Sequence, residues 1–269
     1  MTRFCGALLA ATSLLTPAAW GQGAPARWSD VEGRIQYAYY TEDVRALRSM
    51  LASLKPRLAE GEQESTVADA VPRAYFRALV HYRLAQVLNA SNKSQAKDAV
   101  DDCQDEVDNS VEALPEVPLG LDESDLNKHL RAEAYVLGTA CTLAGREMSS
   151  IPFSGGRIGS RIEEAIKLEP KNPRVRLVEA LVAFDRAGKD AAAKSAAIAR
   201  LRNVTAMFES ARAGLTEAPE WGTAEAYAFL GRALFEQRDV VSAREALERA
   251  LLIAPDYAYA KRLTAQITR

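Results

Sequence analysis

The feature that most constrains the fold of this chain is a 34-residue pattern that runs from Ala224 to Tyr257. Its first half carries large apolar residues at helical spacing around Gly231, and its second half repeats that spacing around Ala243 before Pro255 ends it. Small residues at Gly231 and Ala243 allow two antiparallel helices to cross closely, because a larger side chain would hold the backbones apart. The large residues that fill the gaps beside the crossing are Tyr227, Leu230, Leu234 and Leu247.

This period and its Tyr-x2-Leu-Gly-x2-Leu first helix resemble the tetratricopeptide repeat (TPR). Degenerate versions of the pattern lie at about 71–118 and about 131–172. One repeat cannot bury its apolar face alone, so neighbouring repeats must stack into a continuous core. The resemblance therefore implies an all-α fold, a TPR-like α-solenoid of antiparallel helix pairs, which forms a single domain over residues 29–269.

Nearly the whole chain after its N-terminus is similar to a family of exported bacterial TPR-like proteins of uncharacterised function. The segments that carry this resemblance are 36–43 (QYAYYTED), 168–174 (LEPKNPR), 219–228 (PEWGTAEAYA) and 254–257 (APDY). The chain departs from the family at 185–193, where a Pro/Gly-rich loop is expected and DRAGKDAAA looks more helical. A looser likeness is to periplasmic TPR proteins that accompany solute transporters, which is an analogy of fold only.

Apolar residues recur at helical spacing along the chain, and no segment alternates like a strand. A turn near Thr41 divides the first helical region, and Trp221 is expected to anchor the chain just before a helix N-cap at Thr223. Residues 149–160 (SSIPFSGGRIGS) are expected to form a loop. The expected helices lie at about 29–55, 71–88, 94–114, 122–147, 161–168, 173–187, 190–213, 223–236, 240–252 and 256–268.

The N-terminus has the pattern of a secretory signal peptide. Arg3 precedes a short apolar core at 7–15, Pro17 follows, and Ala19 and Gly21 provide small residues for cleavage. Residues 1–21 are thus expected to be removed, and residues 22–28 to be a flexible lead-in. No other stretch is apolar enough to span a membrane, so a periplasmic or secreted location is predicted.

Composition and motifs favour a binding protein over an enzyme. Lys+Arg and Asp+Glu number 34 and 36, so no basic field favours nucleic acid. The two histidines, His81 and His129, are isolated and form no metal-binding motif, and no phosphate-binding or nucleophile motif is present. We expect a non-catalytic scaffold without cofactor or metal, which binds an unknown protein or peptide partner or a small solute. The alternatives are an enzyme with its site in the inserted loops and a purely structural assembly factor.

Two charged segments each have a possible binding role and a purely structural interpretation. Residues 155–161 (GGRIGSR) offer glycine amides and two arginines to an anion, but no strand precedes them, so a connecting loop is favoured. Acidic residues form a stripe along one helical face, which is interpreted as a solvated face in preference to a surface for a basic partner or cation. The stripe consists of Asp98, Asp101, Asp102, Asp105 and Asp108.

Removal of the signal peptide leaves two cysteines, Cys103 and Cys141. An even number of cysteines in an oxidising compartment is compatible with a disulfide. Cys103 and Cys141 lie on successive helices of neighbouring units, which pack side by side in a TPR array. The pair is therefore either a disulfide or two small buried thiols, and the sequence leaves both open.

The binding face is expected on the first helix of each pair, since those helices line the concave side of a TPR array. Beside the apolar stripe of the clearest repeat, the groove candidates are Phe229, Arg232, Phe235 and Glu236. Aromatic residues and arginine are enriched at interface hot spots. Tyr135 and Thr139 take the corresponding places on the 122–147 helix. The alternative is that Phe229 and Phe235 pack against the terminal helix or the 190–213 helix.

Export gives the first testable prediction. In its native host, the mature protein is expected to begin near Gln22, because the small residues at Ala19 and Gly21 match the positions that a signal peptidase reads. Intact-mass spectrometry of the envelope fraction measures this directly. A soluble cytoplasmic protein that retains residues 1–21 would contradict the prediction.

Overall fold

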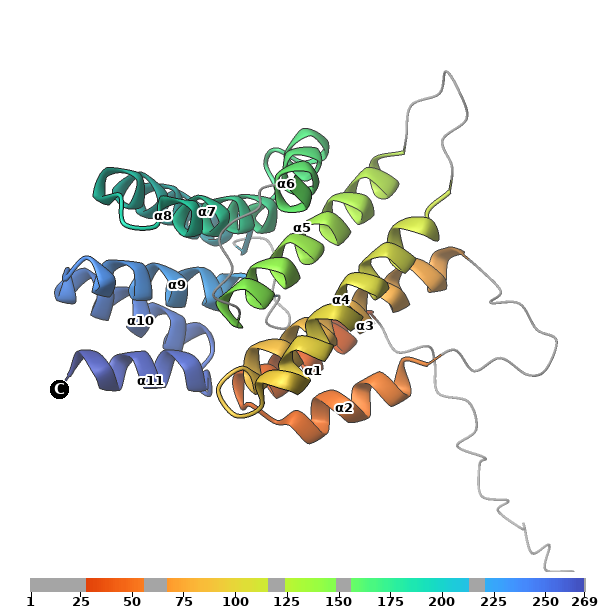
Figure 1. Ribbon diagram of the computed structural model, residues 1–269, viewed down its shortest axis with the longest axis horizontal. Helices are drawn as coiled ribbons and strands as arrows, with labels where there is room; N and C mark the ends of the chain where they lie inside the picture. Colours follow the sequence, from red (N-terminus) through yellow and green to blue (C-terminus); the bar gives the residue numbers. More distant parts are fainter. Residues whose placement is uncertain (1–27, 56–66, 116–123, 149–155, 213–220, 269) are drawn as a thin grey trace, which may run out of the picture.

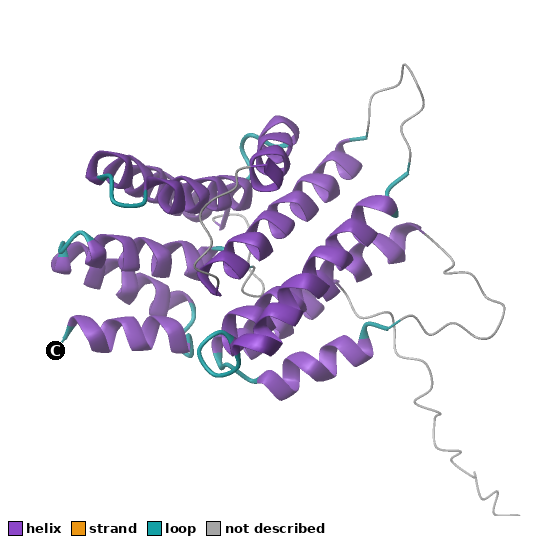
Figure 2. Ribbon diagram, in the orientation of Figure 1, coloured by secondary structure: helices purple, strands orange, loops and turns teal. Residues whose placement is uncertain are grey.

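The computed structural model describes residues 28–55, 67–115, 124–148, 156–212 and 221–268 of the chain. The described residues form helices and turns without a strand (Figure 2). The helices are α1 (Trp28–Tyr40), α2 (Val44–Ser53), α3 (Val67–Leu88), α4 (Lys93–Glu112), α5 (Asp125–Met148), α6 (Gly156–Leu168), α7 (Pro173–Ala187), α8 (Ala191–Arg212), α9 (Thr223–Glu236), α10 (Val240–Ile253) and α11 (Ala258–Ile267).

The helices pack as neighbours in chain order, which makes the fold an all-α solenoid, as predicted (Figure 1). The most extensive contacts join α3 to α4, α9 to α10 and α7 to α8. Helices α4 and α5 also pack side by side. The expected degenerate repeats near 71–118 and 131–172 fall on α3–α4 and on α5–α6. Within the described ranges, no helix is both long and apolar enough to cross a membrane.

Short polar side chains set the starts of several helices. The carboxylates of Asp43 and Asp239 accept from the amides three residues on, at 2.9 and 3.2 Å. Asn92 caps α4 in the same manner, and Asn172 caps α7 by accepting from the amide two residues on. Each cap satisfies an amide that the first helical turn leaves without a partner. Between α7 and α8 the turn is short, because Gly188 adopts a φ of 53°, which glycine reaches without strain.

Several helix starts differ from the sequence prediction, and two of them involve glycine. Helix α6 begins at Gly156, so residues 156–160 of the expected 149–160 loop are helical, while residues 149–155 lie outside the described part of the chain. Helix α9 has its N-cap at Gly222 and not at Thr223, and Glu225 accepts from the Gly222 amide at 2.9 Å. In both cases a glycine lies at the start of the helix, at N1 of α6 and at the N-cap of α9.

The close helix crossing predicted at Gly231 is present between α9 and α10. A Cβ on Gly231 would lie 2.7 Å from Leu247 Cγ and 3.1 Å from the Ala243 carbonyl oxygen. Such contacts are shorter than van der Waals contact, so no larger residue fits without movement of the helices. Leu247, fully buried, fills the space beside the glycine.

The solenoid folds back so that its first helix contacts its last repeat (Figure 1). Glu225 on α9 accepts from the Gln36 amide and from the Tyr40 hydroxyl, both on α1 and both at 3.0 Å. The hydroxyls of Tyr39 and Tyr257 lie 2.9 Å apart. Burial raises the pKa of the Tyr257 phenol well above its usual value, so this contact consists of neutral hydroxyls at physiological pH.

A buried ion pair stands at the centre of this contact. The guanidinium of Arg83, on α3, pairs with the carboxylate of Glu225, and their side chains are only 1% and 2% exposed. Arg83 also donates to Gln36 Oε1 at 3.0 Å and lies 4.1 Å above the Tyr39 ring centroid. Although burial alone lowers the pKa of the guanidinium, Glu225 and the surrounding tyrosines raise it overall, so Arg83 stays charged.

A second set of contacts joins α1 to the start of α9. Glu32 accepts from the Trp221 backbone amide at 2.9 Å and from Arg174 Nη2 at 2.9 Å. The Trp221 indole is buried and donates to the Tyr75 hydroxyl at 2.8 Å. Trp221 therefore anchors the chain before α9, as the sequence indicated, but it does so by contacts with α1 and α3.

The buried ion pair gives a stability prediction. Replacing Arg83 alone by Met is expected to lower the free energy of unfolding by about 3–5 kcal/mol, because Glu225 would remain buried without its partner charge. Replacing both residues, Arg83→Met with Glu225→Leu, is expected to cost less than the sum of the two single changes. Urea unfolding of the two single variants and the double variant measures the coupling. Additive losses would show that the two charges do not depend on each other.

Candidate functional site

A cavity of about 250 Å³ lies among α3, α5, α7, α8 and α9. All but α8 are the first helices of their pairs, the helices expected to line the concave side of the array. The cavity therefore lies on the side of the array where the TPR resemblance predicts the groove. The residues that line it are Tyr82, Gln86, Ala140, Leu143, Ala144, Leu181, Phe184, Asp185, Gly188, Lys194, Leu201, Phe229, Arg232, Ala233 and Glu236.

One part of the cavity wall is apolar. Leu181 and Phe184 come from α7, Leu201 from α8 and Phe229 from α9, and all four belong to one hydrophobic cluster. Leu143, on α5, completes this wall. A wall of this kind gains free energy by removing an apolar ligand surface from water.

A chain of ion pairs borders the apolar wall. Glu236 accepts from Lys194 Nζ at 3.1 Å through one oxygen and from Arg232 Nε at 3.2 Å through the other. The Lys194 ammonium also lies 5.0 Å from the Phe184 ring centroid, within range of a cation–π interaction. On the neighbouring side, Asp185 pairs with Arg146 at 3.0 Å. Polar groups thus hold defined positions beside an apolar surface.

The end of the cavity formed by α3 is linked to the buried ion pair of the fold. Gln86 accepts from Arg83 Nη1 at 2.7 Å and donates to the Tyr82 hydroxyl at 3.2 Å. Gln86 and Tyr82 line the cavity, while Arg83 is buried behind them. The closure of the solenoid therefore also sets the positions of two groups in the cavity wall.

Three of the six predicted groove residues line this cavity, namely Phe229, Arg232 and Glu236. Phe235, also on α9, instead packs against the hydrophobic cluster of α7 to α10. Phe229 does both, since its ring lies 6.3 Å from that of Tyr259 on α11. The alternative, in which the two rings pack against neighbouring helices, therefore holds for Phe235. It holds only in part for Phe229, which also lines the cavity.

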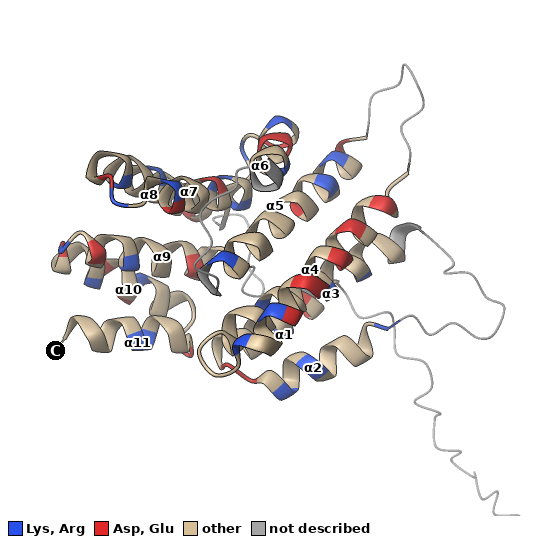
Figure 3. Cartoon of the chain, viewed as in Figure 1, with Lys and Arg blue, Asp and Glu red and all other residues tan. Residues whose placement is uncertain are grey.

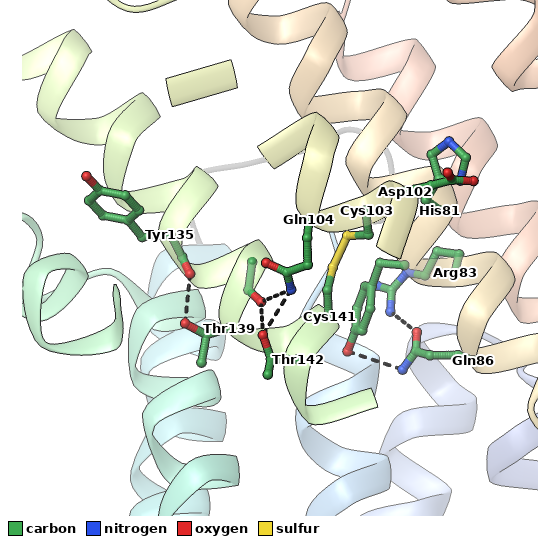
Figure 4. The surroundings of a disulfide bond; sticks show 12 residues. His81, Arg83, Gln86, Asp102, Cys103, Gln104, Tyr135, Thr139, Cys141 and Thr142 are labelled. Atoms are coloured by element: carbon green, nitrogen blue, oxygen red, sulfur yellow. Dashed lines mark hydrogen bonds and ion pairs between the residues drawn. A yellow bond between two sulfur atoms is a disulfide. The ribbon is translucent and has the colours of Figure 1, made fainter. Parts of the chain in front are cut away.

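Tyr135 and Thr139 lie on a different face of α5 from the cavity. The Thr139 hydroxyl is buried and donates to the Tyr135 carbonyl oxygen at 2.8 Å, and Figure 4 shows the Tyr135 ring pointing away from the disulfide. The α5 residues that line the cavity are Ala140, Leu143 and Ala144. Counted from the Leu137-Gly138 and Leu230-Gly231 pairs, Ala140 and Leu143 take the places of Ala233 and Glu236, whereas Tyr135 takes the place of Ala228, which does not line the cavity.

The prediction missed Phe184 and Lys194, which come from α7 and α8. Their signal was present, since Leu181, Phe184, Asp185 and Gly188 recur at i, i+3, i+4 and i+7, the spacing of one helix face. It was passed over because the segment around residues 185–193 was compared with a loop. Lys194 follows directly in the first turns of α8.

A disulfide joins Cys103 on α4 to Cys141 on α5, next to the cavity wall at Ala140 (Figure 4). The two Cα atoms are 6.4 Å apart, within the usual range for a disulfide. Gln104 reinforces the same helix contact by donating to the Gly138 carbonyl and the Thr142 hydroxyl at 2.7 and 2.9 Å. Both cysteine side chains are fully buried, so a structural cross-link is the simplest role.

Figure 3 shows the acidic residues of α4 as red segments along the helix. Two members of the stripe are paired by basic groups from neighbouring helices. Asp102 lies 3.4 Å from His81 Nδ1, and Asp108 pairs with Arg161 of α6. Asp98, Asp101 and Asp105 are exposed. The stripe therefore combines a solvated surface with contacts that hold α4 against α3 and α6.

A second recess holds a group with metal-ligand chemistry on α5 and the α6–α7 turn. Ligand atoms of His129, Glu133 and Glu169 lie within 4.8 Å of one another. However, Asn172 Nδ2 donates to both carboxylates at 2.7 Å, and Arg174 pairs with Glu133 at 3.1 Å. These donors already satisfy the two carboxylates, so the group is better explained as a polar network that joins α5 to α7.

The electrostatics of Glu133 agree with that explanation. Burial raises the pKa of its carboxyl group, but Arg174 and the hydrogen bond from Asn172 more than offset burial and lower the pKa below its usual value. Tyr75 also donates to this carboxylate at 3.0 Å. Glu133 therefore acts as the ionised partner of fixed donors.

No protein-family model and no curated protein matches this sequence. The function is therefore inferred from the geometry of the chain itself.

The disulfide gives a further prediction. In unfolded, non-reduced protein that lacks residues 1–21, thiol titration is expected to find no free thiol. Replacing Cys103 and Cys141 together by Ala is expected to lower the free energy of unfolding by about 2–4 kcal/mol, because the unfolded chain would lose its cross-link. Reduced wild-type protein is the matched control and is expected to fall toward the double variant. Two titratable thiols in the non-reduced protein would show that the bridge is absent.

Proposed function

We propose that this chain is a TPR-like binding scaffold of the bacterial envelope, whose ligand occupies the cavity among α3, α5, α7, α8 and α9. The observation that supports this most strongly is the convergence of Phe229, Arg232 and Glu236 on an inner cavity with an apolar wall and fixed charges. Cavities that combine apolar walls with a few placed polar groups are the usual form of ligand sites.

The TPR likeness supports the same proposal. The 34-residue period over 224–257 coincides with α9, α10 and the turn into α11, with Gly231 at their crossing. Helix-pair arrays of this kind present concave surfaces to ligands. The signal-peptide pattern at 1–21, which lies outside the described residues, supports a periplasmic or secreted location.

The size of the cavity favours one of the ligand classes considered. Ligand sites commonly enclose about 300–1,000 Å³, and this cavity encloses about 250 Å³. A small solute or a single side chain of a peptide fits such a volume, whereas a folded partner would contact only the rim. We therefore place a small solute first and a peptide or protein partner second.

A matched pair of arginine variants tests the proposal. Arg232 pairs with Glu236 one helical turn on, and Arg244 makes the same contact with Glu248 on the exposed face of α10. Arg232→Ala is expected to weaken ligand binding about tenfold or more, as loss of a charged hydrogen bond does, while Arg244→Ala leaves binding unchanged. Both variants should melt near the wild-type temperature, because exposed i,i+4 pairs contribute little to stability.

The ligand for this test comes from a thermal-shift screen of envelope metabolites, followed by calorimetry with the best stabiliser. A pull-down from envelope extract covers the peptide and protein class. Equal binding by the Arg232→Ala and Arg244→Ala variants would place the site elsewhere on the chain.

A further inference from the structure

We infer that the cavity takes a small uncharged molecule, an aromatic or branched apolar group that carries one hydrogen-bond acceptor such as a carbonyl oxygen. This inference rests on the proposed function, since it assigns the chemical class of the ligand to the same cavity. It is carried by the balance of the charges that line the cavity, by the partners that those charges already have, and by the orientation of the Gln86 amide.

The charged side chains that line the cavity balance. They are two cations, Lys194 and Arg232, and two carboxylates, Asp185 and Glu236. Opposite unit charges at short range cancel each other's field for a group that approaches both. The lining therefore offers an ion no net attraction, and the affinity for a ligand must come from other contacts.

Each of these four charges also has a partner within the chain. Glu236 accepts from Lys194 Nζ at 3.1 Å and from Arg232 Nε at 3.2 Å. Asp185 pairs with Arg146 at 3.0 Å. An ionised ligand would lose hydration on entering the cavity and would have to compete with these partners for a counter-charge. The same holds for both charges of a zwitterion, whereas a neutral ligand leaves every pair intact.

Gln86 supplies a hydrogen-bond donor of fixed orientation at the α3 end of the cavity (Figure 4). Its Oε1 accepts from Arg83 Nη1 at 2.7 Å, and a guanidinium has donors but no acceptor. The amide oxygen must therefore face Arg83, which turns the NH2 group toward Tyr82, a residue of the cavity wall. This group has two N–H donors. One donates to the Tyr82 hydroxyl at 3.2 Å, and we assign the other to the ligand.

An uncharged oxygen is the acceptor that suits this donor. A carboxylate could accept the same N–H, but its charge would remain without a counter-ion in the cavity, whereas a carbonyl oxygen needs only the hydrogen bond. The Arg232→Ala test above applies to such a ligand as well, because a neutral oxygen can accept from an arginine that keeps its carboxylate.

The apolar group of the ligand would lie against the wall formed by Leu143, Leu181, Phe184 and Phe229. These side chains come from α5, α7 and α9, and Gln86 lies on α3, so the wall and the donor belong to one cavity. The volume of about 250 Å³ admits one ring with a short chain. Size, charge and the amide donor together therefore specify the class of ligand.

The test uses four probes that share a phenylethyl group and differ in the charge of the head group. They are benzylacetone, which is a neutral ketone, hydrocinnamate, 4-phenylbutan-2-amine and the zwitterion homophenylalanine. Calorimetry with the wild-type chain is expected to show the ketone binding about tenfold or more tightly than each charged probe, because only the charged probes must shed the hydration of an ion. Added salt should leave the affinity for the ketone unchanged, since an uncharged ligand has no charge to screen.

A matched pair of glutamine variants tests the donor. Gln86→Glu keeps an oxygen for Arg83 but removes the NH2 group, and it is expected to weaken binding of the ketone about three- to tenfold, the loss of one neutral hydrogen bond. It also adds a negative charge, so the amine probe should bind more tightly than it does to wild type. Gln95 likewise accepts from an arginine, Arg48, but is exposed on α4, so Gln95→Glu is expected to leave all four affinities unchanged.

The outcomes separate this inference from the proposed function. A charged probe that binds as tightly as the ketone would overturn the uncharged class, and equal ketone affinities of Gln86→Glu and Gln95→Glu would overturn the assigned donor. If Phe229→Ala weakens the probe that does bind, the cavity remains the binding site in either case. If no probe binds to folded wild-type protein, the inferred ligand class is wrong. The comparison of Arg232→Ala with Arg244→Ala then decides the proposed function by itself.

Discussion

The buried pair of Arg83 and Glu225 is the interaction on which the arrangement of this protein depends. Burying two charges is costly, and the pair is tolerated because hydrogen-bonding groups surround both partners. Glu225 accepts from Gln36, Tyr40 and the Gly222 amide in addition to Arg83. These contacts join α9 to α1 and α3, from which a simple solenoid would keep it apart. An open helical array thereby becomes a closed one.

The cavity is a consequence of that closure. Its wall includes Tyr82 and Gln86 of α3 opposite Phe229 of α9, and Gln86 is held by Arg83. The Cys103–Cys141 bridge fixes α5 against α4 beside the same wall, at Ala140. Groups that are held by a rigid surrounding lose little freedom when a ligand binds, which favours affinity and selectivity for a small molecule.

Local patterns in the sequence predicted the helices well. The spacing of apolar residues located α7, α9 and α10 almost to the residue, because each has one continuous apolar stripe and a polar or proline boundary. Half of the proposed groove residues line the cavity, and all three of these lie on α9, where the repeat pattern set the register. On α5 the Leu-Gly pair gave the correct register, since Ala140 and Leu143 stand where Ala233 and Glu236 stand on α9. The predicted Tyr135 instead corresponds to Ala228, which lies outside the cavity wall.

The sequence by itself determined the all-α class, the stacking of neighbouring helix pairs and the close crossing at Gly231, since these follow from spacing within about two helical turns or one repeat. Only the tertiary structure decided that the two ends of the array meet. Gln36 and Glu225 are separated by 189 residues, and no local spacing encodes a contact between them. Glu32 shows the same limit, because it accepts from Arg174 and from the Trp221 amide, which lie 142 and 189 residues further along the chain. The partner of a buried polar group is set by which helices the whole fold brings together.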